Sequence, residues 1–243
     1  MDLSNRVFKY NLHIMKKSIF KFLITLALVN MFFYLITIKY HSQYEYELLY
    51  DNKIGHIVIL DLIIINIFML ASSFESYAQN FKLALNFGSS RKEFYKSLLI
   101  INLISSFLLA LVHSILQIID KIMLEYMEME PFITFKLHDN PIINFIIIMI
   151  SLLISFLAIY GLYNIFAILQ YRYNYGFWIG FGALIIFGST ILGKRAEGLM
   201  LILANTYNFL LPILNIYTIA VMAGIVAVPL YIIGYFLFKS STC

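Results

Sequence analysis

Long apolar runs constrain this chain more than any other feature. Several of them reach the length of about 20 residues that a helix needs to cross a bilayer, and short polar connectors separate them. Of the 243 residues, 62% are hydrophobic and 12% are charged, whereas soluble domains are nearer about 50% and 25%. The sequence therefore predicts an all-α polytopic membrane protein, with one transmembrane domain over residues 1–243.

Six transmembrane helices are predicted from these runs. They cover residues 18–38, 57–73, 90–119, 142–169, 177–192 and 216–238. Asn140 and Pro141 predict the start of the fourth span, as an N-cap followed by proline at the first helical position. The third span is longer than the hydrocarbon core, so its first turns are expected to project into the cytoplasm.

Three further segments complete the predicted layout. Residues 1–17 place apolar side chains on one helical face beside basic ones, which predicts an N-terminal interfacial helix. Residues 75–88 predict a short cytoplasmic helix between spans two and three. Residues 199–214 are apolar but broken by Asn205, Asn208 and Pro212. We predict a re-entrant hairpin there, with a full span as the alternative.

The distribution of lysine and arginine predicts the orientation. Most of the 17 basic residues fall on one side of the predicted spans, which is the cytoplasmic side under the positive-inside rule. Both termini are therefore expected in the cytoplasm of a cell that carries this protein in its plasma membrane. Lys194 and Arg195 run against the rule. Because the basic residues lie in short connectors, the net charge of +4 does not indicate a nucleic-acid partner.

The stretch from Phe81 to Leu98 is the most basic interruption of the apolar pattern. Gly88 is placed to end one helix, and Ser90 with Glu93 three residues later forms a capping box that starts the next. Cations in a first helical turn oppose the helix dipole, so local stability does not explain Arg91 and Lys92. They are topogenic charges, and they also suit a docking surface for a partner, with Phe81, Leu85 and Phe94 as apolar anchors.

The run from Phe87 to Tyr95 resembles the permease subunits of ABC-2 type ABC exporters. In those subunits a G-x-S-R-K-x-F/Y signature follows the coupling helix that docks into the ATPase subunit. The matching residues here are Gly88, Ser90, Arg91, Lys92 and Phe94. The six-span plan, the interfacial helix and the broken segment before the last span are also similar to that family.

The resemblance implies partners and a role. It implies a second permease copy, identical or related, and a separate ATP-binding subunit that holds ATP and Mg, with no cofactor in this chain and no enzymatic activity of its own. Residues 75–88 would be the coupling helix and residues 199–214 the outer gate. The exported substrate would be amphipathic: an antimicrobial or cytolytic peptide, a drug or a lipid. The implied coupling interface comprises Phe81, Lys82, Leu85, Gly88, Ser90, Arg91, Lys92, Glu93 and Phe94.

A polar stripe follows one face of the third predicted span. Such groups in a membrane face the bundle interior or a wet cavity, and either hydrogen bonds between helices or the lining of a substrate path would use them. Asp61 lies about two turns into the second span, where an acid is either a buried functional group or a side chain that reaches toward the outer interface. The candidate path residues are Asn102, Ser106, His113, Gln117, Asp120 and Asp61.

The sequence bears on two other function classes, an intramembrane enzyme and a non-transporting binding protein. An intramembrane enzyme needs convergent acids and histidines, whereas the spans hold only His113 and Asp61 and no His-Glu-x-x-His motif. The run from Gly188 to Arg195 is close to the sequence of a phosphate-binding loop, but it lacks the serine or threonine after Lys194 that would hold magnesium. It therefore does not predict nucleotide binding by this chain. A non-transporting immunity or sensor protein, which binds a cationic peptide at acidic outer connectors, stays open as the alternative.

Overall fold

The computed structural model describes residues 3–43, 57–126, 140–194 and 216–240. Every secondary-structure element in these ranges is a helix, which confirms the predicted all-α class. The elements are α1 (Leu3–Gln43), α2 (Ile57–Glu75), the π-helical η1 (Ser76–Asn80), α3 (Phe81–Asn86), α4 (Arg91–Tyr126), α5 (Pro141–Tyr173), α6 (Tyr175–Lys194) and α8 (Ile216–Ser240).

Five helices in the described ranges are long and apolar enough to cross a membrane, as expected of a multi-pass membrane protein. They are Phe8–Ile36, Leu60–Asn86, Arg91–Met123, Pro141–Tyr173 and Ala220–Ser240. The predicted span over residues 177–192 lies in α6, where the qualifying apolar helix is the shorter Tyr175–Leu184. The predicted re-entrant segment over residues 199–214 lies outside the described residues.

The N-terminal segment is one helix, and the predicted division between an interfacial helix and a first span is wrong. α1 runs unbroken for 41 residues, about 62 Å at 1.5 Å per residue. Its sequence contains no glycine or proline, so nothing in the backbone ends the helix near residue 17. Three of the basic residues that suggested a separate segment, Lys9, Lys16 and Lys17, lie exposed on its surface.

The predicted short helix at residues 75–88 is also not a separate element. α2 continues through η1 into α3, and the junction residues Glu75, Asn80 and Phe81 all keep right-handed helical dihedral angles. The π-helical turn widens the helix locally without breaking it. The second span and the predicted cytoplasmic helix therefore form one continuous helix that ends at Asn86.

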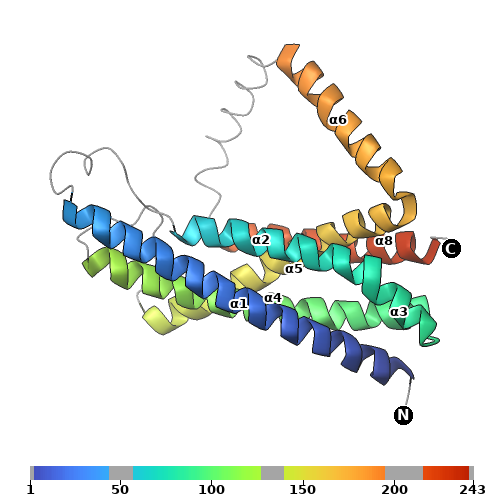
Figure 1. Cartoon of the computed structure of the whole chain (residues 1–243), viewed down its shortest axis with the longest axis horizontal. Helices are drawn as coiled ribbons and strands as arrows, with labels where there is room; N and C mark the ends of the chain where they lie inside the picture. Colours follow the sequence, from blue (N-terminus) through green and yellow to red (C-terminus); the bar gives the residue numbers. More distant parts are fainter. Residues whose placement is uncertain (1–2, 44–56, 127–139, 195–215, 241–243) are drawn as a thin grey trace.

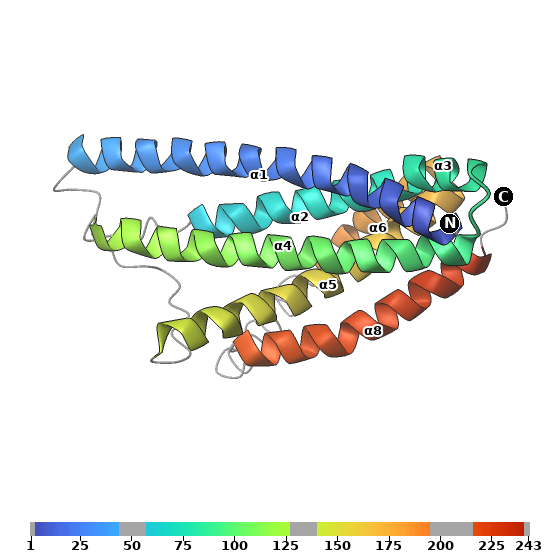
Figure 2. The ribbon, with the colours of Figure 1, turned by 90° about the horizontal axis from the view of Figure 1, so that it is seen from below.

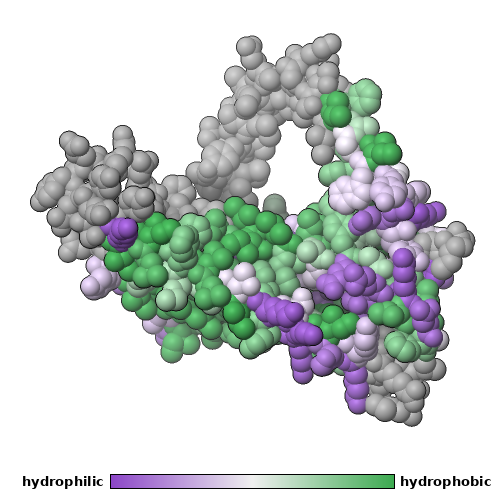
Figure 3. All heavy atoms as spheres, in the orientation of Figure 1, coloured by the Kyte–Doolittle hydropathy of each residue, from purple (hydrophilic) through white to green (hydrophobic). Residues whose placement is uncertain are grey.

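The long helices form a bundle with α4 at its centre. α4 packs against α1, α2 and α5, and the most extensive helix pair is α5 with α8. Figures 1 and 2 show the start of α1, the α3–α4 turn and the end of α8 at the same end of the bundle. In Figure 3, hydrophilic residues gather over that end, and hydrophobic residues cover the surface farther along the bundle.

α5 and α8 run parallel to each other. A Cβ atom built on Gly224 would lie 3.4 Å from Ile154, and one built on Gly161 would lie 3.1 Å from Leu230. The residue numbers rise together along both helices, so their C-terminal ends meet at the same end of the bundle. α6 leaves this end and leans away from the other helices, as Figure 1 shows.

Candidate functional site at the α3–α4 turn

The end of α3 is a Schellman motif. Gly88 has φ of 77°, the left-handed region that glycine adopts without a Cβ penalty. Its N–H donates to the carbonyl of Leu85 at 2.9 Å, and the N–H of Ser89 donates to the carbonyl of Ala84 at 3.0 Å. This pair of bonds satisfies carbonyls that a helix end leaves unpaired, and it confirms Gly88 as the helix stop.

The start of α4 is the predicted capping box. The backbone N–H of Ser90 donates to Oε2 of Glu93 at 2.8 Å, and the backbone N–H of Glu93 donates to Oγ of Ser90 at 3.3 Å. Two N–H groups that the helix cannot pair are satisfied reciprocally. The chain between α3 and α4 therefore has a defined geometry over only four residues, 87–90.

Aromatic side chains fix this turn to the rest of the bundle. Phe81 and Phe94 are both 0% exposed, and Tyr77 and Phe238 are 1% exposed. The ring centroids of Phe81 and Phe238 lie 4.7 Å apart, and those of Phe81 and Phe94 lie 5.1 Å apart. Tyr171 of α5 joins the cluster edge-on to Phe81. η1, α3, α4, α5 and α8 thus share one buried aromatic cluster.

The prediction that Phe81 and Phe94 are surface anchors for a partner is wrong. Neither side chain has any exposed area, and Leu85 is half-buried against the same cluster. The sequence could not show this, because the rings that cover them belong to Tyr171 and Phe238, far along the chain. A partner could reach these residues only by unpacking the bundle.

Other residues form the exposed surface of the turn. Phe87 is 60% exposed and Leu83 is 38% exposed, and Lys82, Lys92 and Lys96 are exposed beside them in the sequence. We call these five residues the tip surface. The sequence predicted Lys82 and Lys92 as interface residues. It did not predict Phe87 as the exposed aromatic residue of the tip surface, although Phe87 directly precedes Gly88, which ends α3. Arg91 is half-buried.

A hydrogen bond links the cluster to α8. The Tyr95 hydroxyl donates to the backbone carbonyl of Tyr231 at 2.7 Å. Tyr95 is 3% exposed, and a Cβ atom built on Gly234 would lie 2.8 Å from its hydroxyl oxygen. The absence of a side chain at Gly234 therefore lets the start of α4 approach α8 closely.

The polar stripe of α4 lies inside the bundle. Asn102, Ser106, His113 and Asp120 are buried, and Gln117 is half-buried with its Nε2 atom 3.2 Å from Nε2 of His113. Tyr34 of α1 donates to Oδ1 of Asp120 at 3.2 Å. This contact is a hydrogen bond between helices, which is one of the two roles that the sequence left open.

Asp61 of α2 is held in the same manner. It is 1% exposed, and Nδ2 of Asn30 donates to its Oδ1 at 2.8 Å. Asn30 and Tyr34 are four residues apart on α1, so one helical face supplies donors to carboxylates on two other helices. Asn30 was not predicted as a site residue, although an asparagine inside an apolar run indicates the bundle interior.

Comparisons with known proteins add no family to this geometry. No family model, curated protein or solved structure matches the chain. Among the described residues, no group of three or more His, Cys, Asp or Glu is placed to hold a metal ion. The features of the molecule that bear on its function are therefore the α3–α4 turn, the aromatic cluster and the buried polar groups.

Proposed function

We propose that this chain is the permease subunit of an ABC exporter. The observation that carries the proposal is the α3–α4 turn, where the Gly88 stop and the Ser90–Glu93 cap fix a basic tip surface with Phe87 exposed. An exposed aromatic residue among lysines is suited to a protein partner with acidic and apolar groups. In this proposal the partner is an ATP-binding subunit that holds ATP and Mg.

The aromatic cluster supports a mechanical role for the turn. A force on the tip surface would pass through Phe81 and Phe94 into α4, α5 and α8, because these helices share the buried rings. α4 contains 36 residues, about 54 Å at 1.5 Å per residue, so a tilt at its start moves its far end. Closure of the ATP-binding subunits would thereby reorient the spans.

The parallel packing of α5 and α8 supports six crossings. After α5 ends at Tyr173, the chain must return to the opposite end of the bundle before α8 begins at Ile216. α6 has 20 residues, about 30 Å of helix, which equals the hydrocarbon thickness. We assign α6 as the fifth span and α8 as the sixth, with both termini in the cytoplasm and residues 199–214 as a re-entrant gate.

The remaining parts of the proposal follow the same family plan. The complex contains a second permease copy, and the substrate is an amphipathic peptide, drug or lipid that moves outward across the plasma membrane. The buried polar groups of α2 and α4 would line part of its path. These groups are Asp61, Asn102, Ser106, His113, Gln117 and Asp120.

The experiment that tests the proposal uses the exposed residues of the tip surface. The full-length chain is purified from its native membrane, and any co-purifying ATP-binding subunit is identified by mass spectrometry. We expect the double variant Phe87→Ala, Lys92→Glu to lose this subunit or its substrate-stimulated ATP hydrolysis, and to remain in the membrane at the normal level. Purification of the unaltered chain with no ATP-binding subunit would contradict the proposal.

One control variant makes the result specific. Lys121→Glu with Tyr126→Ala makes the same kind of change at the other end of α4, where both side chains are exposed, and should keep the ATP-binding subunit. Phe94→Ala is unsuitable as a coupling variant, because removing a fully buried phenylalanine costs about 3–5 kcal/mol. A loss of function in Phe94→Ala would report unfolding of the cluster as much as loss of docking.

The same experiment separates the alternative function. An immunity or sensor protein that binds a cationic peptide would protect cells when it is expressed alone, without any ATP-binding subunit. The acidic connectors that suggested this function lie largely outside the described residues. Peptide resistance that survives the double tip variant and needs no ATPase would favour it over the exporter.

A further inference from the structure

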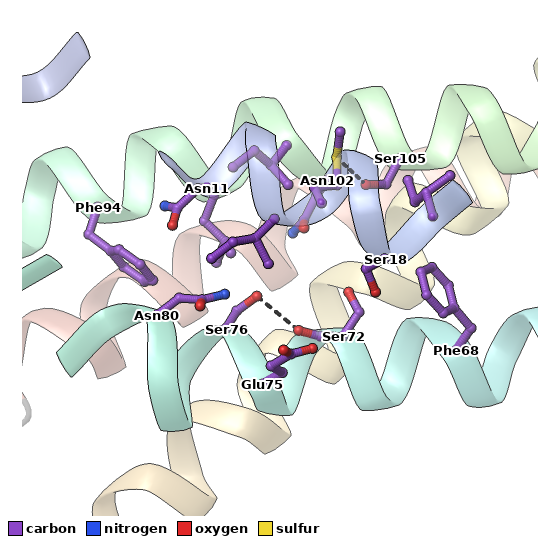
Figure 4. Close-up of a pocket in the computed structure, with 15 residues that line it drawn as sticks. Asn11, Ser18, Phe68, Ser72, Glu75, Ser76, Asn80, Phe94, Asn102 and Ser105 are labelled. Atoms are coloured by element: carbon purple, nitrogen blue, oxygen red, sulfur yellow. Dashed lines mark hydrogen bonds between the residues drawn. The ribbon is translucent and has the colours of Figure 1, made fainter. Parts of the chain in front are cut away.

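A polar cleft lies between α1, the continuous α2–η1 helix and α4. None of the residues of the tip surface lines it. Each helix lines it with one face, since the lining residues recur at steps of three or four. Figure 4 shows Asn11 and Ser18 of α1, Ser72 and Glu75 of α2, and Asn80 of η1 around one space. Asn102 and Ser105 of α4 line the third side.

The π-helical turn shapes one wall of this cleft. Ser76 and Asn80, which bound η1, both line the space, and the Ser76 hydroxyl donates to the backbone carbonyl of Ser72 at 2.8 Å. Single π-turns inside α-helices cost stability and occur frequently at functional sites. A π-turn that lines a cleft is therefore a candidate part of a binding site.

The cleft carries one formal charge. Glu75 is the only charged residue among those that line it, and no ion pair to Glu75 forms within the described part of the chain. The side chain is exposed, so its carboxylate is available at the mouth. A positively charged ligand would therefore be attracted to the Glu75 carboxylate at the mouth of this cleft.

A buried acceptor adds a second, independent feature. Asn11 is 5% exposed, and its Nδ2 donates to the Ser97 hydroxyl at 3.3 Å. Its Oδ1 has no hydrogen-bond partner among the described residues. A buried amide oxygen without a partner destabilises the folded state, and a ligand that donates an N–H group to it would remove this penalty.

The size of the cleft limits what can enter. Its volume is about 40 Å³, and one water needs roughly 10–15 Å³ on this measure. The space therefore suits one small charged group and a short stem, not a whole peptide or drug. Ile14, Phe68 and Leu98 supply apolar walls for methylene groups of such a stem.

We propose that the α1–η1–α4 cleft binds a primary alkylammonium group. The ammonium carries one positive charge for the Glu75 carboxylate and three N–H donors for acceptors such as Oδ1 of Asn11 and the serine hydroxyls. A quaternary ammonium has the same charge but no N–H donor to offer these acceptors. The source is either the ethanolamine headgroup of a phospholipid or a soluble amine.

The test measures thermal unfolding of the purified full-length chain in detergent. We expect butylammonium chloride to raise the unfolding temperature in a saturable manner, and tetramethylammonium chloride and sodium chloride at equal ionic strength to leave it unchanged. Ligand binding to the folded state alone produces such a shift. An equal shift with all three salts would overturn the proposal.

Two cleft variants and one control identify the site. Glu75→Gln removes the negative charge but keeps the size and shape of the exposed side chain. It should reduce the affinity for butylammonium at least tenfold. Asn11→Leu removes the unpartnered acceptor and should also weaken binding. Glu125→Gln changes an exposed acid in the last turn of α4 and should bind normally. Normal binding by both cleft variants would exclude this site.

Lipid nanodiscs separate the two sources of the ammonium group. If phosphatidylethanolamine occupies the cleft, discs of this lipid should weaken apparent butylammonium binding relative to phosphatidylcholine discs with the same acyl chains. Equal binding in both discs supports a soluble amine as the ligand. Absence of butylammonium binding in both discs would overturn the assignment, and neither result depends on the presence of an ATP-binding subunit.

Discussion

At the scale of single residues, two glycines near the α3–α4 turn are required for different reasons. Gly88 provides a positive φ that ends α3, and the sequence already indicates this from the polar residues around it. Gly234 is an ordinary helical glycine whose missing Cβ makes room for the Tyr95 hydroxyl. No local pattern distinguishes Gly234 from the other glycines of the apolar runs, because its neighbour lies 139 positions earlier in the chain, at residue 95 of α4.

Substitution of Gly234 by alanine is expected to destabilise the protein. The new Cβ would lie 2.8 Å from the Tyr95 hydroxyl oxygen, and the hydrogen bond to the Tyr231 carbonyl prevents Tyr95 from moving freely. Overpacking of this kind costs about 1–3 kcal/mol. Thermal unfolding in detergent measures the loss. Gly176→Ala is the matched control, since a Cβ there meets nothing within 4 Å, and an equal loss in both variants would contradict the packing argument.

At the scale of helices, local sequence signals predicted helix starts and ends well where unpaired backbone N–H and C=O groups need hydrogen-bond partners. The Ser90 cap, the Gly88 stop and the Asn140 cap, whose Oδ1 accepts from the N–H of Ile142 at 2.9 Å, all occur as predicted. Charged residues were a poorer signal. The basic residues of the N-terminal segment suggested a boundary near residue 17, but a surface charge leaves the backbone hydrogen bonds intact, so the helix continues through it.

The continuity of α1 makes a direct prediction. Lys17→Pro would remove a backbone donor in the middle of a helix and clash with the preceding turn, which costs about 3 kcal/mol or more. Lys17→Ala at the same exposed position should be nearly neutral. The level of protein in the membrane and its unfolding temperature report the difference. If proline were tolerated as well as alanine, residues 1–17 would be a separate segment after all.

At the scale of the whole molecule, the parallel pair of α5 and α8 decides how the ends of the chain are placed. Their C-terminal ends lie together with the start of α1 and the α3–α4 turn, and the end of α4 lies at the opposite end of the bundle. If the bundle crosses a membrane, residues at these two ends must face different compartments. This arrangement agrees with the asymmetry of basic residues along the sequence.

Cysteine labelling tests this arrangement. In a background where Cys243 is replaced by serine, Lys92→Cys and Lys239→Cys should react from the same side of the membrane. Lys121→Cys should react from the opposite side. All three lysines are exposed, so a membrane-impermeant maleimide reports their side directly in intact cells and inverted vesicles. Labelling of Lys92→Cys and Lys239→Cys from different sides would contradict the parallel packing of α5 and α8.

The sequence by itself determined the class of this protein and the geometry of its tightest turn. Apolar runs of bilayer length and caps at Ser90 and Asn140 act over a few residues, so composition and spacing suffice to predict them. Only the tertiary structure decided that Phe81 and Phe94 are buried, that Phe87 is exposed, and that Asn11 and Glu75 share a cleft. The physical reason is that burial depends on which distant helices pack together, and the residues around a phenylalanine in its own helix do not specify those helices.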